Sequence, residues 1–236
     1  MNLQPAPGND TLVPVFSPER LGLTEGGEAR FRGALERIAG EGELKAKLLL
    51  AALDHFAARG FDGVQVKEVA EEAGVSKPTL YYHFGSKEGL FRQLCLVALA
   101  VTEKRLRDMV APHLGARPSD PAAVRASALR LSASYVDLLM ELPQFTGFIL
   151  RAIAVPGPDS TFRDLMPVVE RALSPLGLYV NHVFGMDFEQ ARKEVMVYTA
   201  IFGALLEEHL RRPEYAIDAG EIAWAVDRWL RGIQGA

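Results

Sequence analysis

The chain has 236 residues, of which 49% are hydrophobic and 24% charged, and its formal net charge is −4. This length is sufficient for one large or two smaller domains with a sizeable core, and the composition is that of an ordinary globular protein. The acidic balance excludes a nonspecific nucleic-acid coat. It does not exclude a sequence-specific binder, because that function depends on where the positive charges lie.

The single cysteine, Cys95, excludes a disulfide within the chain and fits a reducing cytoplasm. It lies in the apolar run LCLVALAV, which favours a small buried hydrophobic residue over a redox-active thiol. The sequence has no uninterrupted apolar run of about 18 residues. Its N-terminus lacks the basic-then-apolar pattern of a signal peptide. We therefore expect a cytoplasmic protein.

The first part of the chain is predicted to be an arm followed by an extra helix. Residues 1–27 contain four prolines and several glycines, which indicate a flexible or extended segment. Residues 28–39 carry apolar side chains at helical spacing, with arginines beside them. We expect this helix to pack against the following domain. The alternative is that its arginines contact phosphate.

Three helices are predicted between residues 43 and 84. The first, Glu43–Arg59, has a continuous apolar face and ends at Gly60. Two short helices with a tight turn follow over residues 66–84, and Gly74 supplies the turn. Ser76 can cap the second of them, because it stands just before the apolar-periodic stretch and is followed by a proline in the first turn.

The helix Lys77–Phe84 has an unusual face. Leu80 and Phe84 can point inward, whereas the other side chains are polar, aromatic or basic and cannot all be buried. A helix of this kind fits the major groove of DNA, with the preceding helix braced across the phosphate backbone. The pattern alone also allows an ordinary surface hairpin with half-buried tyrosines.

The motif AGVSKPTLYYHF, preceded by FAARGFDG and followed by SKEGLF, resembles the N-terminal domain of the TetR family of bacterial transcriptional regulators. The similarity runs without a gap from about Lys45 to Leu94. One difference concerns the helix that contains Val69. In the family it usually begins with Ser or Thr, and here Val64 and Gln65 occupy those positions. We therefore expect this helix to lack its usual N-cap.

The resemblance implies a role for each residue of the motif. Lys77, Pro78 and Tyr81 would face base edges, and Lys67 would reach a base or a phosphate. Phosphates would be held by Thr79, Tyr82, His83 and Lys87, and Ser76 belongs to the same expected DNA-binding set. Between Leu44 and Arg92 there are seven basic and six acidic residues, a net charge of only +1. A dimer is therefore needed for useful affinity.

The remaining chain predicts further helices and no strand. A long helix from Lys87 to about Ala111 connects the two regions, and we expect Leu94, Val97, Ala98, Val101 and Leu106 to belong to the core of the larger, C-terminal domain. Further helices are expected at 122–142, 144–155, 161–184 (interrupted near Pro167 or Pro175), 187–210 and 219–233. The prediction is an all-α protein of about ten helices. Its parts are an arm (1–27), a helix-turn-helix DNA-binding domain (28–92) and a regulatory and dimerisation domain (93–236).

The helix at 187–210 is apolar on more than one side, and the helix at 219–233 carries an apolar stripe. The small residues Ala200, Gly203 and Ala204 would allow a second helix to approach closely. We expect a homodimer through these two helices, arranged as a four-helix bundle. Such a dimer presents two reading helices to a palindromic operator.

The resemblance also implies a small-molecule pocket in the C-terminal domain. The candidates are aromatic or polar residues among apolar ones: Phe145, Phe148, Arg151, Tyr179, His182, Tyr198 and Phe202. Taken singly, each of them also fits an ordinary core or surface position. The expected ligand is small and apolar or amphipathic.

An enzyme is not expected. The sequence lacks a GxSxG elbow, a GxxxxGK loop, an HExxH motif and a cysteine pair, and its five histidines are scattered. No cofactor and no metal site are predicted. A protein-binding helical adaptor would explain a dimer face but not an exposed TLYYH helix. The hypothesis is a homodimeric repressor that a ligand releases from its operator.

Overall fold

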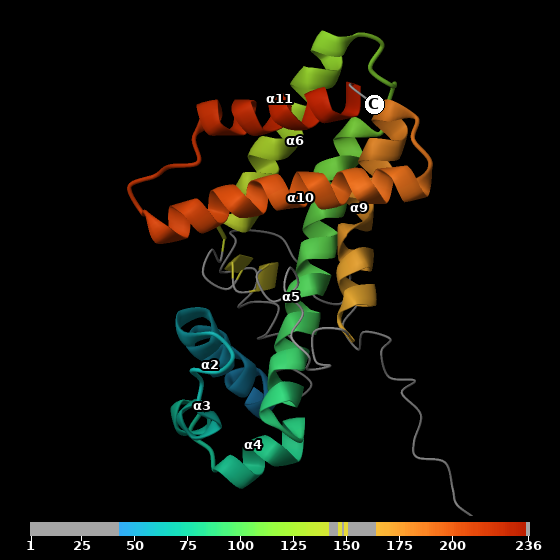
Figure 1. Cartoon of the computed structure of the whole chain (residues 1–236). Coiled ribbons are helices and arrows are strands. Elements are labelled where there is room, and N and C mark those ends of the chain that lie inside the picture. The colour runs from blue at the N-terminus through green and yellow to red at the C-terminus, as the bar shows by residue number, and fades with distance from the viewer. Residues whose placement is uncertain (1–42, 142–145, 148, 151–163, 235–236) are drawn as a thin grey trace, which may run out of the picture.

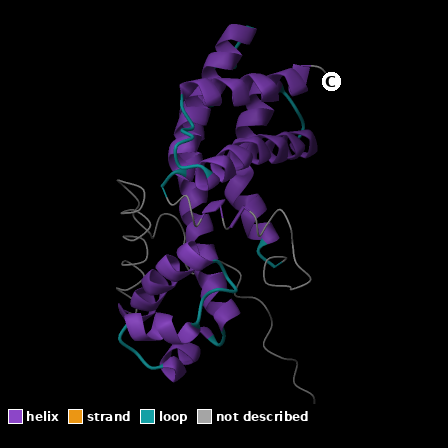
Figure 2. Ribbon diagram, turned by 60° about the vertical axis from the view of Figure 1, so that its left-hand side comes forward, coloured by secondary structure: helices purple, strands orange, loops and turns teal. Residues whose placement is uncertain are grey.

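The computed structural model describes residues 43–141, 146–147, 149–150 and 164–234. In these ranges the protein has eight α-helices, one short 3-10 helix and no strand (Figures 1 and 2). None of the described helices is both long enough and apolar enough to cross a bilayer. The arm 1–27 and the helix 28–39 lie outside the described residues. The predicted helix 144–155 is described only at four positions, which are helical.

The N-terminal unit consists of α2 (Glu43–Arg59), α3 (Val66–Glu72), α4 (Lys77–Phe84) and the first part of α5 (Lys87–Val110). These bounds agree with the predicted helices. The unit lies at one end of the molecule, and α5 leads away from it toward the remaining helices (Figure 1). Its core holds fully buried side chains from every helix, among them Phe56, Val69, Leu80 and Phe91.

Two glycines with positive φ separate these short helices. Gly74, at φ +72°, follows α3, and Gly85, at φ +74°, ends α4. Only glycine adopts a positive φ at little cost, so both turns can be predicted from the sequence. Ser86 then caps α5, because its hydroxyl accepts the backbone N–H of Gly89 at 3.1 Å.

Helix α5 belongs to both regions of the protein. Leu106 and Val110 lie in the core of the C-terminal part. Leu94, Val97 and Val101, however, pack in the core of the N-terminal unit, and Ala98 lies against it. The expectation that these four residues belong to the larger core is wrong. The N-terminal core continues about four turns along α5, since α5 residues as far as Val101 form one cluster with α2 and with Leu165.

Cys95 lies in the same N-terminal core and is 1% exposed. Burial raises the pKa of its thiol, so the thiol stays protonated and unreactive at neutral pH. This confirms the prediction of a small buried hydrophobic residue.

The C-terminal part contains the 3-10 helix Ala111–His113, then α6 (Pro121–Leu139), α9 (Met166–Phe184), α10 (Phe188–Arg211) and α11 (Ala219–Gln234). In Figure 1, α9 runs beside α5, whereas α10 and α11 cross the far end of the molecule. The observed bounds agree with the predicted helices within a few residues. The exception is α9, which begins at Met166 rather than Thr161.

Helix α9 is not interrupted at Pro175, contrary to one of the two predicted positions. Pro167 stands in the first turn, where a missing N–H costs nothing, and Pro175 lies inside a continuous helix. Pro175 and its neighbour Leu176 are both buried. Burial of this face against the core offsets the single lost backbone hydrogen bond.

A charged contact fixes α5 against α9. Glu103 is 8% exposed, and it accepts a hydrogen bond from Arg107 at 2.6 Å and pairs with Arg171 of α9 at 3.2 Å. A buried carboxylate is tolerated only where it is paired, and two guanidinium groups meet that need here. The orientation of α9 relative to α5 is therefore specified by charge as well as by apolar packing.

Candidate nucleic-acid interface and ligand groove

Helix α4 is capped as the sequence predicts. The Ser76 hydroxyl accepts the backbone N–H of Thr79 at 3.3 Å, and the two side-chain hydroxyls lie 2.8 Å apart. Pro78 occupies the first turn. On the inner side Leu80 and Phe84 are buried, which anchors α4 to the core of the N-terminal unit.

The outward face of α4 carries the side chains expected to contact DNA. Tyr82 is 86% exposed and Tyr81 37% exposed, and Lys77, Pro78 and His83 are exposed as well. The face combines exposed aromatic and basic side chains, a combination suited to binding a partner. The structure therefore brings these residues together on one surface.

Neighbouring side chains on this face are already in contact. The Lys77 ammonium lies 5.5 Å from the centre of the Tyr81 ring, one helical turn away. The rings of Tyr82 and His83 meet edge to face at 5.3 Å. Such contacts restrict the side chains before DNA arrives and so lower the entropy lost on binding.

Two further lysines of the expected set have partners within the protein. The Lys87 ammonium lies 4.6 Å from the centre of the Phe61 ring and donates to the backbone oxygen of Asp62 at 3.4 Å. Lys67 pairs with Glu71 at 3.5 Å, and both side chains are well exposed. Lys67 can exchange its partner for a phosphate at little cost, because exposed ion pairs are weak. Lys87 is more firmly held.

Helix α3 has no side-chain N-cap. Gln65 occupies the N-cap position in an extended conformation, and its side chain makes no capping hydrogen bond. This confirms the expectation drawn from Val64 and Gln65. Val64 is instead buried, so its contribution is to the core rather than to capping.

Sequence reasoning missed one cation near the interface. Lys45, in the first turn of α2, places its ammonium 5.8 Å from the centre of the Phe84 ring, at the end of α4. The two residues are far apart in the sequence, and no local pattern connects them.

The ligand-binding candidates within the described residues lie mainly in the C-terminal core. Tyr179, Tyr198 and Phe202 are at most 2% exposed. The hydroxyls of the two tyrosines reach serines of α6: Tyr179 donates to Ser127 at 3.2 Å, and Tyr198 lies 2.9 Å from Ser132. Burial raises the pKa of both tyrosines, so both stay neutral.

His182 is partly buried, and its Nε2 atom has no hydrogen-bond partner among the described residues. Phe145, Phe148 and Arg151 lie outside the described residues. The structure does not gather the described candidates around a cavity, and their role in ligand binding stays a prediction.

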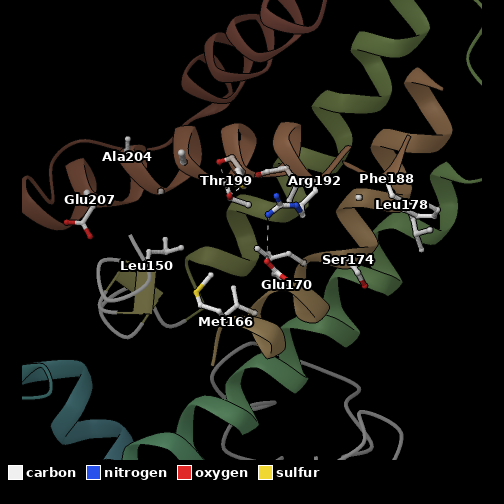
Figure 3. Close-up of a pocket in the computed structure, with 17 residues that line it drawn as sticks. Leu150, Met166, Glu170, Ser174, Leu178, Phe188, Arg192, Thr199, Ala204 and Glu207 are labelled. Atoms are coloured by element: carbon white, nitrogen blue, oxygen red, sulfur yellow. Dashed lines mark hydrogen bonds and ion pairs between the residues drawn. The ribbon is translucent and has the colours of Figure 1, made fainter. Parts of the chain in front are cut away.

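A groove of about 860 Å³ lies instead between α9 and α10 (Figure 3). Its volume and mainly apolar walls are typical of sites for small organic molecules. One wall is formed by α9, the other by α10, and Leu150 closes one end. The wall residues recur at helical spacing and are Met166, Val169, Glu170, Leu173, Ser174, Gly177, Leu178, Phe188, Arg192, Val195, Met196, Thr199, Ala200, Gly203, Ala204 and Glu207.

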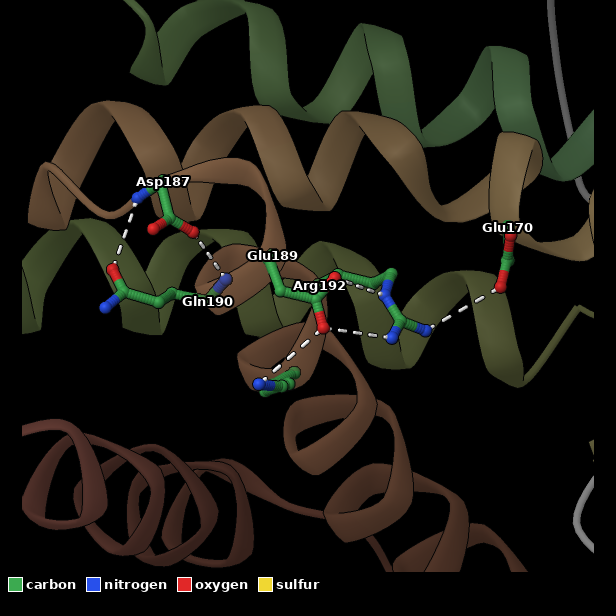
Figure 4. Close-up of polar contacts among 6 residues, drawn as sticks. Glu170, Asp187, Glu189, Gln190 and Arg192 are labelled. Atoms are coloured by element: carbon green, nitrogen blue, oxygen red, sulfur yellow. Dashed lines mark hydrogen bonds and ion pairs between the residues drawn. The ribbon is translucent and has the colours of Figure 1, made fainter.

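Charged side chains at the groove compensate one another. Arg192 of α10 lies 3.3 Å from Glu189 on the same helix and 3.7 Å from Glu170 across the groove (Figure 4). Arg192 lowers the pKa of Glu189 by hydrogen bonding and by its charge. The same region holds the N-terminus of α10, where Asp187 and Gln190 form a reciprocal capping box. The charges at this end of the groove are thus balanced within the protein.

The sequence of the N-terminal unit matches a known family. Residues 48–94 match the model described as bacterial regulatory proteins of the tetR family. Over these residues, the chain is similar to the regulatory proteins of the tetR family. The matched residues include all of α3 and α4, the two helices that build the exposed face described above.

Among curated relatives, the transcriptional regulator RutR of Escherichia coli K12 is 44% identical over 72 residues, which are 29% of this chain and 34% of RutR. The transcriptional activator FasR of Mycolicibacterium smegmatis is 40% identical over 68 residues, 29% of this chain and 28% of FasR. The transcriptional repressor KstR2 of Rhodococcus jostii is 31% identical over 97 residues, 41% of this chain and 48% of KstR2. The chain therefore matches half or less of each of these relatives.

Solved TetR-like structures resemble the whole fold. A TetR-family regulator from Mesorhizobium loti has a TM-score of 0.61 at 18% identity and covers 82% of this chain and 96% of its own. The fatty acid degradation regulator FadR of Bacillus halodurans has a TM-score of 0.58 at 16% identity. The superposition covers 81% of this chain and 96% of FadR. At these identities the likeness concerns the fold alone.

Proposed function

We propose that this protein is a sequence-specific, DNA-binding transcriptional regulator of the TetR family. The observation that carries the proposal is the outward face of α4, where Lys77, Tyr81 and Tyr82 are exposed together while Leu80 and Phe84 hold the helix to its core. The dimensions and chemistry of such a face suit the major groove. Phosphate contacts by Thr79, His83 and Lys67 at its edges would fix the register of the helix on DNA.

Binding to the DNA upstream of its own gene tests this proposal. Fluorescence anisotropy with that fragment and with a scrambled fragment of equal length should give at least a hundredfold difference in affinity at about 150 mM salt. Equal affinity for both fragments at every salt concentration would contradict the proposal, because phosphate contacts alone do not distinguish sequences.

The regulator is proposed to act as a homodimer through α10 and α11. Val197 of α10 and Trp224 of α11 are about half exposed after the chain has formed its own core. The apolar stripe of α11 is otherwise used internally, since Val226, Trp229 and Leu230 are buried. Met196 of α10 is also exposed but lines the groove between α9 and α10. Val197 and Trp224 therefore leave a free apolar surface outside the groove. A dimer buries it and pairs two copies of α4 for the two halves of a palindromic operator.

The effector site is proposed to be the groove between α9 and α10. At two places, neighbouring residues in the sequence contact the groove and the core of the N-terminal unit. Met166 lines the groove and Leu165 is buried in that core. Likewise, Leu150 lines the groove and Ile149 packs against that core. An occupant that moves the groove walls therefore acts directly on the DNA-binding unit. The occupant should be apolar and uncharged overall, because Arg192 is already paired with carboxylates.

A neutral fluorescent probe, N-phenyl-1-naphthylamine, tests the groove. Probe fluorescence should rise and saturate with the wild-type protein and should fail to do so with Gly177→Leu. Gly177 lines the groove, and an added Cβ there has no heavy atom within 4 Å, so a Leu side chain at this position would occupy space in the groove. Ala133→Leu, at an exposed position of α6 away from the groove, is the matched control. Equal probe binding by both variants would contradict the proposed site.

Repression is the proposed mode of action: the free dimer holds its operator, and the effector favours a dimer whose reading helices are wrongly spaced. Of the relatives described above, KstR2 is named a repressor and FasR an activator. A reporter gene behind the operator decides between the two modes, because deletion of the regulator raises expression under repression and lowers it under activation.

A further inference from the structure

Helix α3, which braces α4, lacks the means by which a short helix usually holds its first turn. It has only seven residues and no side-chain N-cap. A helix this short is marginal by itself, since nucleation is unfavourable and few backbone hydrogen bonds form. Its buried residues Val66, Val69 and Ala70 secure one face only. Its C-terminal end is held by backbone hydrogen bonds at the Gly74 turn, where the Val75 N–H donates to the Ala70 carbonyl oxygen at 2.9 Å. Its N-terminal end has no comparable hold.

Two side chains of α2 contact α3 near both ends. Arg59 binds Glu68, in the first turn of α3, with a guanidinium-to-carboxylate distance of 2.8 Å. His55 lies 2.8 Å, through Nε2, from a carboxylate oxygen of Glu72, the last residue of α3. The other ring nitrogen of His55, Nδ1, meets the Arg59 guanidinium. The four side chains thus form one chain of contacts.

The donors and acceptors in this series of contacts follow from the chemistry of the side chains. A guanidinium can only donate, so Nδ1 of His55 accepts from Arg59, and Nε2 is left facing the Glu72 carboxylate at 2.8 Å, in an electrostatic contact without hydrogen-bonding geometry. Glu72 stands at the C-terminal end of α3, where the helix dipole disfavours a negative charge, and the contact with the His55 ring offsets this. Glu68 stands near the N-terminus of α3, where its charge is favourable.

We propose that Arg59 and His55 are positioning residues for DNA binding and replace the missing N-cap of α3. Neither belongs to the outward face of α4. They act through α3, because Val69 and Ala70 of α3 pack in the same core as Leu80 of α4. The proposal rests on the proposed function only where DNA affinity is concerned. The effect on α3 itself does not need DNA.

The alternative to this proposal is that the contacts of Arg59 and His55 have no effect on α3, because exposed ion pairs in general contribute little to stability. The arrangement here differs in one respect. His55, with its side chain 18% exposed, connects two pairs that would otherwise be separate. A matched comparison exists on the same helix, where Lys67 and Glu71 form an isolated, well-exposed pair four residues apart.

Native-state hydrogen exchange at the amides of Val69 and Ala70 tests the proposal. Arg59→Ala should accelerate exchange about fivefold, the effect of losing one N-cap. His55→Ala should accelerate exchange by a similar factor. His55→Gln keeps an N–H near the position of Nε2 and should accelerate exchange less. Glu71→Gln should change exchange less than about twofold, as expected for an isolated surface pair.

A rescue experiment separates positioning from general destabilisation. Gln65→Thr supplies a side-chain cap, so it should restore most of the protection lost in Arg59→Ala and add much less in the wild-type background. Operator affinity should follow the same order, with unchanged base preference. Unchanged α3 exchange in Arg59→Ala, or equal acceleration at all amides, would overturn the proposal. If the protein bound no specific DNA, the exchange results would stand and only the proposed function would fail.

Discussion

Single residues on α4 and at the start of α5 have different expected roles on DNA. Tyr81 lies on the outward face beside Lys77, whereas Lys87 lies off that face and is held by Phe61 and Asp62. A side chain on the face can contact base edges, and one at its margin can contact only phosphate. The resemblance to the family assigned these roles in advance. The structure adds the exposure and the neighbours that make them physically reasonable.

Substitution of these two residues should therefore have different signatures. Tyr81→Ala should relax the preference among operator variants, with a loss of about 1–3 kcal/mol on the best site. Lys87→Ala should weaken binding to all DNA sequences alike. It should also reduce the slope of the logarithm of the binding constant against the logarithm of the salt concentration by about 1. Anisotropy titrations over a range of salt, with one operator and its single-base variants, measure both. Equal changes of specificity in the two variants would show that the division of roles is wrong.

At the scale of elements, the turn between α4 and α5 is closely constrained. Gly85 ends α4 with positive φ, and Ser86 caps α5. A Cβ atom at Gly89 would lie 2.0 Å from the backbone oxygen of Phe84. The end of α4 and the start of α5 can approach this closely only because residue 89 is a glycine.

Gly89→Ala should therefore cost more than about 2 kcal/mol of unfolding free energy, because a backbone carbonyl must move. Gly177→Ala is the matched control. It lies inside α9 with open space around an added Cβ, and it should raise stability by about 0.5–1 kcal/mol. Urea unfolding of both variants measures the difference. A Gly89→Ala variant as stable as the wild type would refute the close approach of the two helices.

At the scale of the whole molecule, α5 is shared by two cores. Its first half completes the DNA-binding unit, its last residues enter the C-terminal core, and Glu103 ties it to α9. Motion of α9, one wall of the groove, would therefore reach the N-terminal unit along α5 and through Leu165. Two copies of this arrangement in a dimer would change the spacing of the two α4 helices.

The dimer can be tested with one charge placed on its expected face. Val197→Glu on α10 should weaken self-association at least about tenfold, since a carboxylate would be buried without a partner. Leu178→Glu, at a similarly exposed apolar residue of α9, is the control and should leave the dimer intact. Sedimentation velocity across a concentration series measures both. A Val197→Glu variant that remains as dimeric as the wild type would place the interface elsewhere.

The sequence by itself determined the local structure of the DNA-binding unit. Gly74 and Gly85 set the turns, Ser76 and Ser86 the caps, and the spacing of Leu80 and Phe84 the inner face of α4. These features depend on residues within one or two turns of each other, so a pattern in the chain is sufficient to find them. The missing cap of α3 was predicted for the same reason.

Only the tertiary structure decided which surfaces meet. It assigned Leu94, Val97 and Val101 to the N-terminal core, kept α9 continuous through Pro175, and placed Tyr198 and Phe202 in the core rather than at the groove. Helical periodicity shows that a residue is apolar and on a given face, but not which neighbour covers that face. Contacts between distant segments, such as Arg59 with Glu68 or Arg192 with Glu170, depend on packing that no local pattern encodes.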